Sequence, residues 1–292
     1  MRSVLLVFIL SALAVAVGAC GEKKSDGFEY SLHGQVLSLK ADHTEANIKH
    51  DEIKGFMPAM TMPYKVKNPK EFEGLVAGDV INGTLVVESN DAYLKNVKKV
   101  GQAPLEAPPP DTPMPTASSG FELLKEGASV PDAKFVDQDG KTFTLHSLKG
   151  SAVVITFIYT KCPMPTFCPL MDRNFAALQE KVKADPALNV RLLTVSFDPA
   201  NDTPPVLKAH AKKLGANPKI WTFLTGDRDD IDKFAAQFGV SLGRPLTDQG
   251  EITHNLRTVI LDRMSNMVRV YTGNEWTPSQ VMADIKALVG VD

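Results

Sequence analysis

Cysteine is scarce in this chain, and neither sign of charge is in excess. Only 3 of the 292 residues are Cys, far below the density of a small protein held together by disulfides. Lys and Arg total 32 against 34 for Asp and Glu, which gives a formal net charge of -2. A near-neutral chain lacks the basic surface that binds phosphate backbones. We therefore expect no nucleic-acid partner, and cysteine chemistry at one or two places.

The motifs of several enzyme classes are also missing. The sequence has no P-loop, no Gly-x-Gly-x-x-Gly after a strand, no His-Glu-x-x-His and no Gly-x-Ser-x-Gly. Nucleotide, dinucleotide, zinc-protease and α/β-hydrolase functions therefore lack support. A thioredoxin-type oxidoreductase normally has Cys-x-x-Cys and a Pro before its last strands, yet no Pro lies between Pro245 and Pro278. The sequence favours a non-enzymatic role and leaves thiol-disulfide exchange open.

The sequence begins with an apolar run from Val4 to Val17, which is followed by Gly18-Ala19-Cys20. It is shorter than the ~20 residues that span a bilayer, so residues 1–19 are predicted to be a secretory signal peptide. Residues 17–20, Val-Gly-Ala-Cys, resemble a bacterial lipobox, which implies lipidation of Cys20. The alternative is ordinary cleavage that leaves Cys20 as a spare thiol. We expect a lipidated tether over 20–29 and a lipoprotein anchored to the membrane at the periplasmic face of the cell envelope.

The rest of the chain divides at a proline-rich stretch. Six prolines fall within twelve positions from Pro104 to Pro115, so residues 102–119 are predicted to be a semi-rigid linker. Residues 30–101 show short apolar runs broken by turns, which indicates a small all-β domain. Residues 120–292 alternate strand-like and helix-like segments, which indicates an α/β domain.

Periodicity places the elements of this second domain. The near-continuous apolar run from Val153 to Thr160 predicts a central strand buried on both faces. Helical spacing predicts a helix over Pro169 to Ala184. Further predicted strands cover 190–196, 221–225, 258–262 and 267–271, and further predicted helices cover 204–214, 229–238 and 277–289. This pattern is compatible with a thioredoxin-like sheet.

The second domain has two cysteines, Cys162 and Cys168, directly after the central strand. Ligands of open α/β sheets bind where strands end at their carboxyl side. Because Pro169 suits a first helical position, Cys168 is expected at the N-cap, where the helix dipole favours a thiolate. His254 precedes a later strand and could complete a soft site for Cu(I) or Zn(II). The alternatives are a structural disulfide or two buried thiols.

At this point the sequence resembles the Sco/SenC family over roughly 129–290. The resemblance is carried by residues 159–163 (Tyr-Thr-Lys-Cys-Pro), 167–171 (Phe-Cys-Pro-Leu-Met), 196–204 (Ser-Phe-Asp-Pro-Ala-Asn-Asp-Thr-Pro), His254 and Asp262. It implies a thioredoxin-like fold, copper bound by Cys162, Cys168 and His254, and a role at the binuclear copper site of cytochrome c oxidase. The family's usual spacing is Cys-x3-Cys, whereas this chain has Cys-x5-Cys with Pro163 and Pro165 inside.

Methionine is concentrated in the first domain, where Met57, Met60 and Met62 are three of the ten in the chain. On a strand, Met60 and Met62 point to the same face, and two thioethers with an imidazole suit Cu(I). The alternative is a barrel interior lined by Met because it fills irregular gaps.

These residues resemble the CusF-like copper-binding domain, a five-stranded OB-type barrel, over roughly 30–100. The resemblance implies that His50, Met60 and Met62 hold Cu(I). At the position of the family's Trp this chain has Met57, so Met57 is a candidate fourth ligand and Phe56 a candidate substitute for the aromatic ring.

Together these features predict an OB-like barrel followed by a thioredoxin-like domain, acting as an extracytoplasmic copper metallochaperone. Its cargo is expected to be Cu(I), with Cu(II) as the second oxidation state. Its partner is expected to be the copper-bearing subunit of cytochrome c oxidase or another copper chaperone. Two alternatives stay open: a thiol-disulfide reductase that keeps oxidase cysteines reduced, and copper sequestration for resistance.

Overall fold

The computed structural model describes residues 27–105, 123–244 and 252–289. The expected signal peptide 1–19, Cys20, the tether up to residue 26 and linker residues 106–119 lie outside the described residues. None of the described helices is both long enough and apolar enough to cross a membrane.

The N-terminal part is a five-stranded antiparallel sheet with the order β3-β2-β1-β4-β5. Its strands are β1 (Phe28–Leu39), β2 (Glu45–His50), β3 (Met60–Lys65), β4 (Asp79–Val87) and β5 (Ala92–Gln102), with a short 3-10 helix at Pro69–Phe72. A parallel bridge between Val66, just after β3, and Leu94 of β5 joins the two edges. The sheet therefore closes into a small barrel with the strand order of an OB fold, as predicted.

The strands of the barrel alternate buried and exposed residues, which is the pattern of a sheet with one face in the core. In β2, Ala46, Ile48 and His50 face inward. Gly34 of β1 pairs with His50, and a Cβ on Gly34 would lie 2.7 Å from the carbonyl oxygen of Lys49. Only glycine permits this close approach of β1 to β2, so Gly34 sets the depth of His50 in the barrel.

The C-terminal part is a seven-stranded sheet with the order β14-β13-β8-β9-β10-β6-β7. Its strands are β6 (Lys134–Asp137), β7 (Thr142–Thr144), β8 (Ala152–Ile158), β9 (Val190–Ser196), β10 (Trp221–Thr225), β13 (Arg257–Leu261) and β14 (Met267–Thr272). Its helices are α1 (Cys168–Ala184), α2 (Pro204–Lys213), α3 (Arg228–Ala236) and α4 (Pro278–Val289), with 3-10 helices at Leu145–Leu148 and Pro186–Leu188. A separate two-stranded ribbon pairs β11 (Leu242–Gly243) with β12 (Thr253–His254).

Strands β8, β9 and β10 are parallel and lie at the centre of this sheet. Right-handed crossovers place α1 and α2 on one face, where α1 also packs on α4. Helix α3 leads back to β13, beyond β8, and its Phe234 packs on Phe157 of β8. Every residue of β8 is buried, as expected for a strand covered on both faces. The prediction of a thioredoxin-like α/β domain is confirmed.

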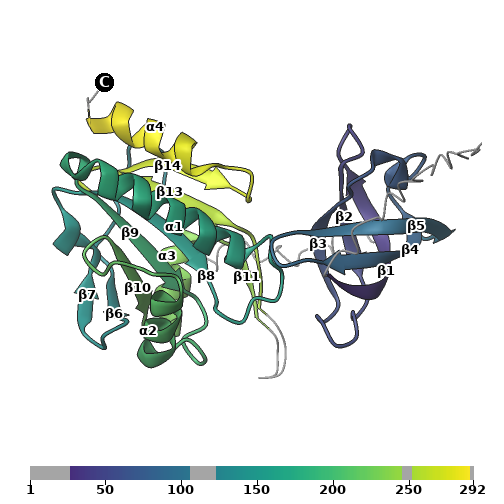
Figure 1. Ribbon diagram of the computed structural model, residues 1–292, viewed down its shortest axis with the longest axis horizontal. Helices are drawn as coiled ribbons and strands as arrows, with labels where there is room; N and C mark the ends of the chain where they lie inside the picture. Colours follow the sequence, from purple (N-terminus) through teal and green to yellow (C-terminus); the bar gives the residue numbers. More distant parts are fainter. Residues whose placement is uncertain (1–26, 106–122, 245–251, 290–292) are drawn as a thin grey trace, which may run out of the picture.

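The barrel lies against one end of the α/β domain, beside the loop that joins β8 to α1 (Figure 1). Met164 of this loop is buried within the hydrophobic cluster of the barrel. Polar contacts also cross the interface: Lys40 Nζ lies 2.9 Å from Glu275 Oε1, and Arg173 donates to the carbonyl oxygen of Asn90 at 3.4 Å. The two parts therefore share a boundary that includes the cysteine loop.

Candidate metal centre

Two parts of the α/β domain bring the sequence-predicted thiols and imidazole together. Strand β8 ends at Ile158, and the chain runs through Cys162 to Cys168, the first residue of α1. His254 ends the short strand β12, which the pairing with β11 holds at the same end of the sheet. The Sγ atoms of Cys162 and Cys168 and a ring nitrogen of His254 all lie within 4.8 Å of one another. Both thiols are free.

The ring of His254 is fixed by its neighbours. Its Nδ1–H donates to the carbonyl oxygen of Asn255 at 3.0 Å, so Nε2 carries the lone pair and faces Cys168 Sγ at 3.5 Å. Phe197 packs against the ring with centroids 4.6 Å apart, and Tyr159 meets it edge-on at 5.7 Å. The tautomer and orientation that a soft metal ion requires are thus already set.

The two thiols differ in acidity. Its hydrogen bond with the Cys168 thiol, followed by its interaction with the His254 ring, lowers the pKa of Cys162 to about 5, against the opposing effect of burial. Burial and the neighbouring Cys162 raise the pKa of Cys168. The sequence-based expectation placed the favoured thiolate at Cys168 on the N-cap of a helix. The N-cap is Phe167, Cys168 is already inside the helix and fully buried, and the favoured thiolate is Cys162.

A buried carboxylate that the sequence analysis did not single out anchors the cysteine loop. Asp202 accepts hydrogen bonds from the backbone N–H of Thr160 at 2.9 Å, from the Thr160 hydroxyl and from the Ser196 hydroxyl. Asp198, by contrast, accepts from the side chain of Asn201 within its own turn. Two aspartates four residues apart after a strand are a signal that the sequence offered. That spacing does not tell which of Asp198 and Asp202 bonds to the cysteine loop.

The barrel gathers the second predicted set, His50, Met60 and Met62. His50 and Met60 are direct cross-strand partners on β2 and β3, and Met62 follows on the same face of β3. The imidazole Nδ1–H of His50 donates to the carbonyl oxygen of Asp51 at 2.6 Å. Among the described residues, His50 Nε2 is one of few buried side-chain atoms without a hydrogen-bond partner. A buried lone pair near thioethers is costly unless it meets a ligand, so the residues present fit a soft metal ion.

The two residues considered in place of an aromatic lid take different positions. Met57 is buried, lines the pocket described below, and accepts a weak hydrogen bond from the Tyr64 hydroxyl at 3.8 Å. Phe56 instead stacks on Tyr30, with ring centroids 4.6 Å apart, and does not line the pocket. The structure therefore gives no support to Phe56 as a lid.

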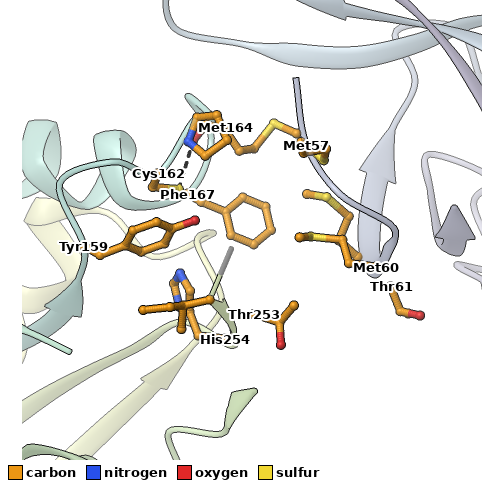
Figure 2. A pocket seen from close by; sticks show the side chains of 12 residues that line it. Met57, Met60, Thr61, Tyr159, Cys162, Met164, Phe167, Thr253 and His254 are labelled. Carbon is orange, nitrogen blue, oxygen red and sulfur yellow. Dashed lines mark hydrogen bonds between the residues drawn. The ribbon is translucent and has the colours of Figure 1, made fainter. Parts of the chain in front are cut away.

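One pocket reaches members of both sets (Figure 2), although His50 and Cys168 do not line it. Its walls come from the barrel and from the α/β domain, and its lining includes Met57, Met60, Met62, Cys162, Met164 and His254. The ring of Phe167 projects into it between His254 and the barrel methionines. Its volume is about 50 Å³. Pockets for organic ligands measure roughly 300–1,000 Å³, so this one suits an ion rather than a metabolite. The sequence analysis missed Met164 and Phe167 as pocket residues. Their local sequence does not show that they contact the other domain.

Comparison with known proteins agrees with this geometry. Residues 125–290 match the family model described as SCO1/SenC, and residues 29–99 match the model described as copper binding periplasmic protein CusF. Both matches support copper binding.

Individual relatives cover the α/β domain. A SCO1 protein homolog of Bacillus subtilis is 32% identical over 155 residues, which are 52% of this chain and 79% of the relative. The crystal structure of a SCO1/SenC family lipoprotein from Bacillus anthracis is 31% identical with a TM-score of 0.51, covering 57% of this chain and 99% of that one. The structure of BsSco, described as a member of the Sco family of cytochrome c oxidase assembly proteins with a disulfide switch, is 29% identical with a TM-score of 0.50, covering 59% of this chain and 100% of that one. The family match spans more than half of the sequence, and we conclude that the chain belongs to the SCO1/SenC family.

Proposed function

We propose that this protein is an extracytoplasmic copper metallochaperone that supports assembly of a copper site in cytochrome c oxidase. The observation that carries the proposal is the convergence of two thiols and an imidazole within 4.8 Å. Cys162 and His254 of this set line a pocket that barrel methionines also line. Thiolate, thioether and imidazole donors together suit Cu(I) and not Mg²⁺ or Ca²⁺. The description of BsSco supports the oxidase as the destination.

The two donor sets differ in the strength with which they hold Cu(I). His50, Met60 and Met62 are neutral donors, whereas Cys162 is already favoured as a thiolate. Cu(I) captured by the barrel would therefore pass to the cysteines by ligand exchange, and from there to the copper-bearing subunit or another copper chaperone. Lipidation of Cys20 would hold the protein at the periplasmic face of the membrane. That anchor is supported by the lipobox resemblance and by the Bacillus anthracis relative, itself described as a lipoprotein.

Delivery is tested by mixing the Cu(I)-loaded chain with the copper-free soluble domain of the oxidase subunit. After anaerobic separation, copper is counted on each protein. We expect copper on the acceptor, and no transfer from a chain carrying Cys162→Ser and Cys168→Ser. Copper that stays on this chain while the acceptor takes it up from free Cu(I) would favour sequestration instead.

The thiol pair also favours a second candidate, a thiol-disulfide reductase. The thiolate of Cys162 would attack a target disulfide, and Cys168 would then resolve the mixed disulfide, leaving Cys162–Cys168 oxidised and the target with two thiols. The reactive pair is supported by the opposite pKa directions of its members. Turnover of a disulfide-bonded acceptor should then tolerate His254→Ala, whereas copper delivery should not.

A further inference from the structure

Met164 packs into the other domain, in a cluster that Cys162 and Phe167 of its own domain also contact. It belongs to the loop between β8 and α1, yet its side chain is 4% exposed and lies in the hydrophobic cluster of the barrel. Its thioether extends toward Met57 in the shared pocket (Figure 2). The extra length of the Cys-x5-Cys loop thus carries a sulfur from the α/β domain into the barrel.

The loop holds this side chain in place. The Phe167 N–H donates to the carbonyl oxygen of Met164 at 3.0 Å, and Arg173 donates to that of Pro165 at 2.9 Å. Pro163 and Pro165 flank Met164 and restrict the backbone on both sides. Cys162 Sγ also lies 3.9 Å from the Met164 carbonyl oxygen. The backbone that carries the thioether is therefore held between the cysteine pair and the barrel.

From this placement we propose that Met164 is a Cu(I) ligand shared by the two sites, through which the ion passes within one chain from the barrel to Cys162, Cys168 and His254. The inference rests on the proposed function, because it requires copper at both sites. It adds to that function a ligand and the route by which copper passes from the barrel to the cysteine pair.

The transfer is a ligand exchange without a redox step. Cu(I) keeps its charge and electrons throughout. A bond from copper to Met60 or Met62 breaks as one to Met164 forms. The bonds to His50 and the other barrel methionine, and then the bond to Met164, break in turn as bonds to the Cys162 thiolate and to His254 Nε2 form. Cys168 then binds and releases its proton to solvent. The direction follows from charge, because an anionic thiolate holds Cu(I) more strongly than a neutral thioether.

Met164→Leu tests this role because it removes the sulfur and nearly conserves side-chain volume. Met282→Leu is the matched control, since Met282 is a buried methionine of α4 away from the pocket. In the full chain carrying Cys162→Ser and Cys168→Ser and one equivalent of Cu(I), copper X-ray absorption counts the sulfur ligands. We expect Met164→Leu to lose one sulfur and to weaken copper binding by roughly tenfold or more, and Met282→Leu to change neither.

With the cysteines intact, the appearance of the Cu(I)–thiolate absorption after anaerobic mixing gives the transfer rate. We expect a rate independent of protein concentration that falls roughly tenfold in Met164→Leu, as a lost metal-site interaction does. An unchanged sulfur count and an unchanged rate would overturn the role of Met164 and leave it as a packing residue. Absence of barrel copper in the chain with native Met164 is a separate outcome, which would overturn the two-site function and this inference together.

Discussion

At the scale of single residues, two histidines from different domains are oriented in the same way. His50 and His254 each donate Nδ1–H to the carbonyl oxygen of the next residue, at 2.6 and 3.0 Å. Each ring therefore presents the lone pair of Nε2, which is the atom available to a metal ion. The sequence predicted both histidines as ligands because of the Cys and Met residues that accompany them. It could not predict their shared tautomer, which depends on the position of a backbone carbonyl group.

The unequal acidity of the two thiols predicts their reactivity in the reduced, copper-free protein. Alkylation at Cys162 should rise with pH through a pKa of about 5, while Cys168 stays protonated and buried. Cys168→Ala should move this transition to higher pH more than His254→Ala does, because the Cys168 hydrogen bond is the larger cause. Mass-spectrometric mapping of alkylation rates checks both points. Faster alkylation of Cys168 than of Cys162 would contradict the account.

At the scale of elements, the sequence predicted the helices and strands that have a regular pattern of apolar residues. The strands β9 and β10 occur at the predicted residues, and α1 begins one residue before its predicted start. The short strands β6 and β7 and the ribbon of β11 and β12 were missed, because strands of two to four residues carry too few alternations to show a period. The ribbon matters to function, since it positions His254.

The contact of β1 with β2 makes Gly34 a sensitive position in the barrel. In Gly34→Ala the new Cβ would overlap the Lys49 carbonyl and the His50 backbone. We expect a loss of about 1–3 kcal/mol in barrel stability, typical of overpacking, together with weaker copper binding by His50. Hydrogen exchange of β2 amides measures the loss. Gly83→Ala is the control, because its Cβ would meet nothing closer than 3.5 Å, and an equal effect there would contradict the steric argument.

The loop that carries Cys162 depends on the carboxylate of Asp202. Asp202→Ala would leave the half-buried Thr160 and the buried Ser196 donors without their acceptor. The expected cost is about 1–3 kcal/mol of unfolding free energy, with looser protection of the loop in hydrogen exchange. Asp198→Ala removes a carboxylate from the same turn without touching the loop, so it should leave loop protection unchanged. Equal protection in both variants would remove Asp202 from this role.

At the scale of the whole molecule, the two domains meet through polar contacts around a sulfur-lined pocket. Glu275 of the α/β domain lies 2.9 Å from Lys40 and 3.8 Å from Lys65 of the barrel. These groups are exposed, so each pair contributes little to stability and weakens with salt. Their effect is on the orientation of the domains, which the sequence could not give because contacts between domains leave no periodic pattern.

Reversal of the charge at this contact should loosen the interface without unfolding either domain. Glu275→Lys would place three cations together, and the cysteine loop should then exchange hydrogen faster while the melting temperature hardly changes. Asp139→Lys is the control, because it breaks an exposed pair with Lys208 inside the α/β domain. If the loop exchanges at the native rate in Glu275→Lys, the polar contacts do not orient the domains.

The most direct test of the central claim is the anaerobic Cu(I) stoichiometry of the reduced chain with Cys20 removed, measured against a competing chelator. The account predicts two equivalents, falling to one in His254→Ala and to one in a variant carrying Met60→Leu and Met62→Leu. Retention of both equivalents in His254→Ala would remove His254 from the ligand set. Absence of any tightly bound copper would contradict the metallochaperone and leave the thiol-disulfide reductase.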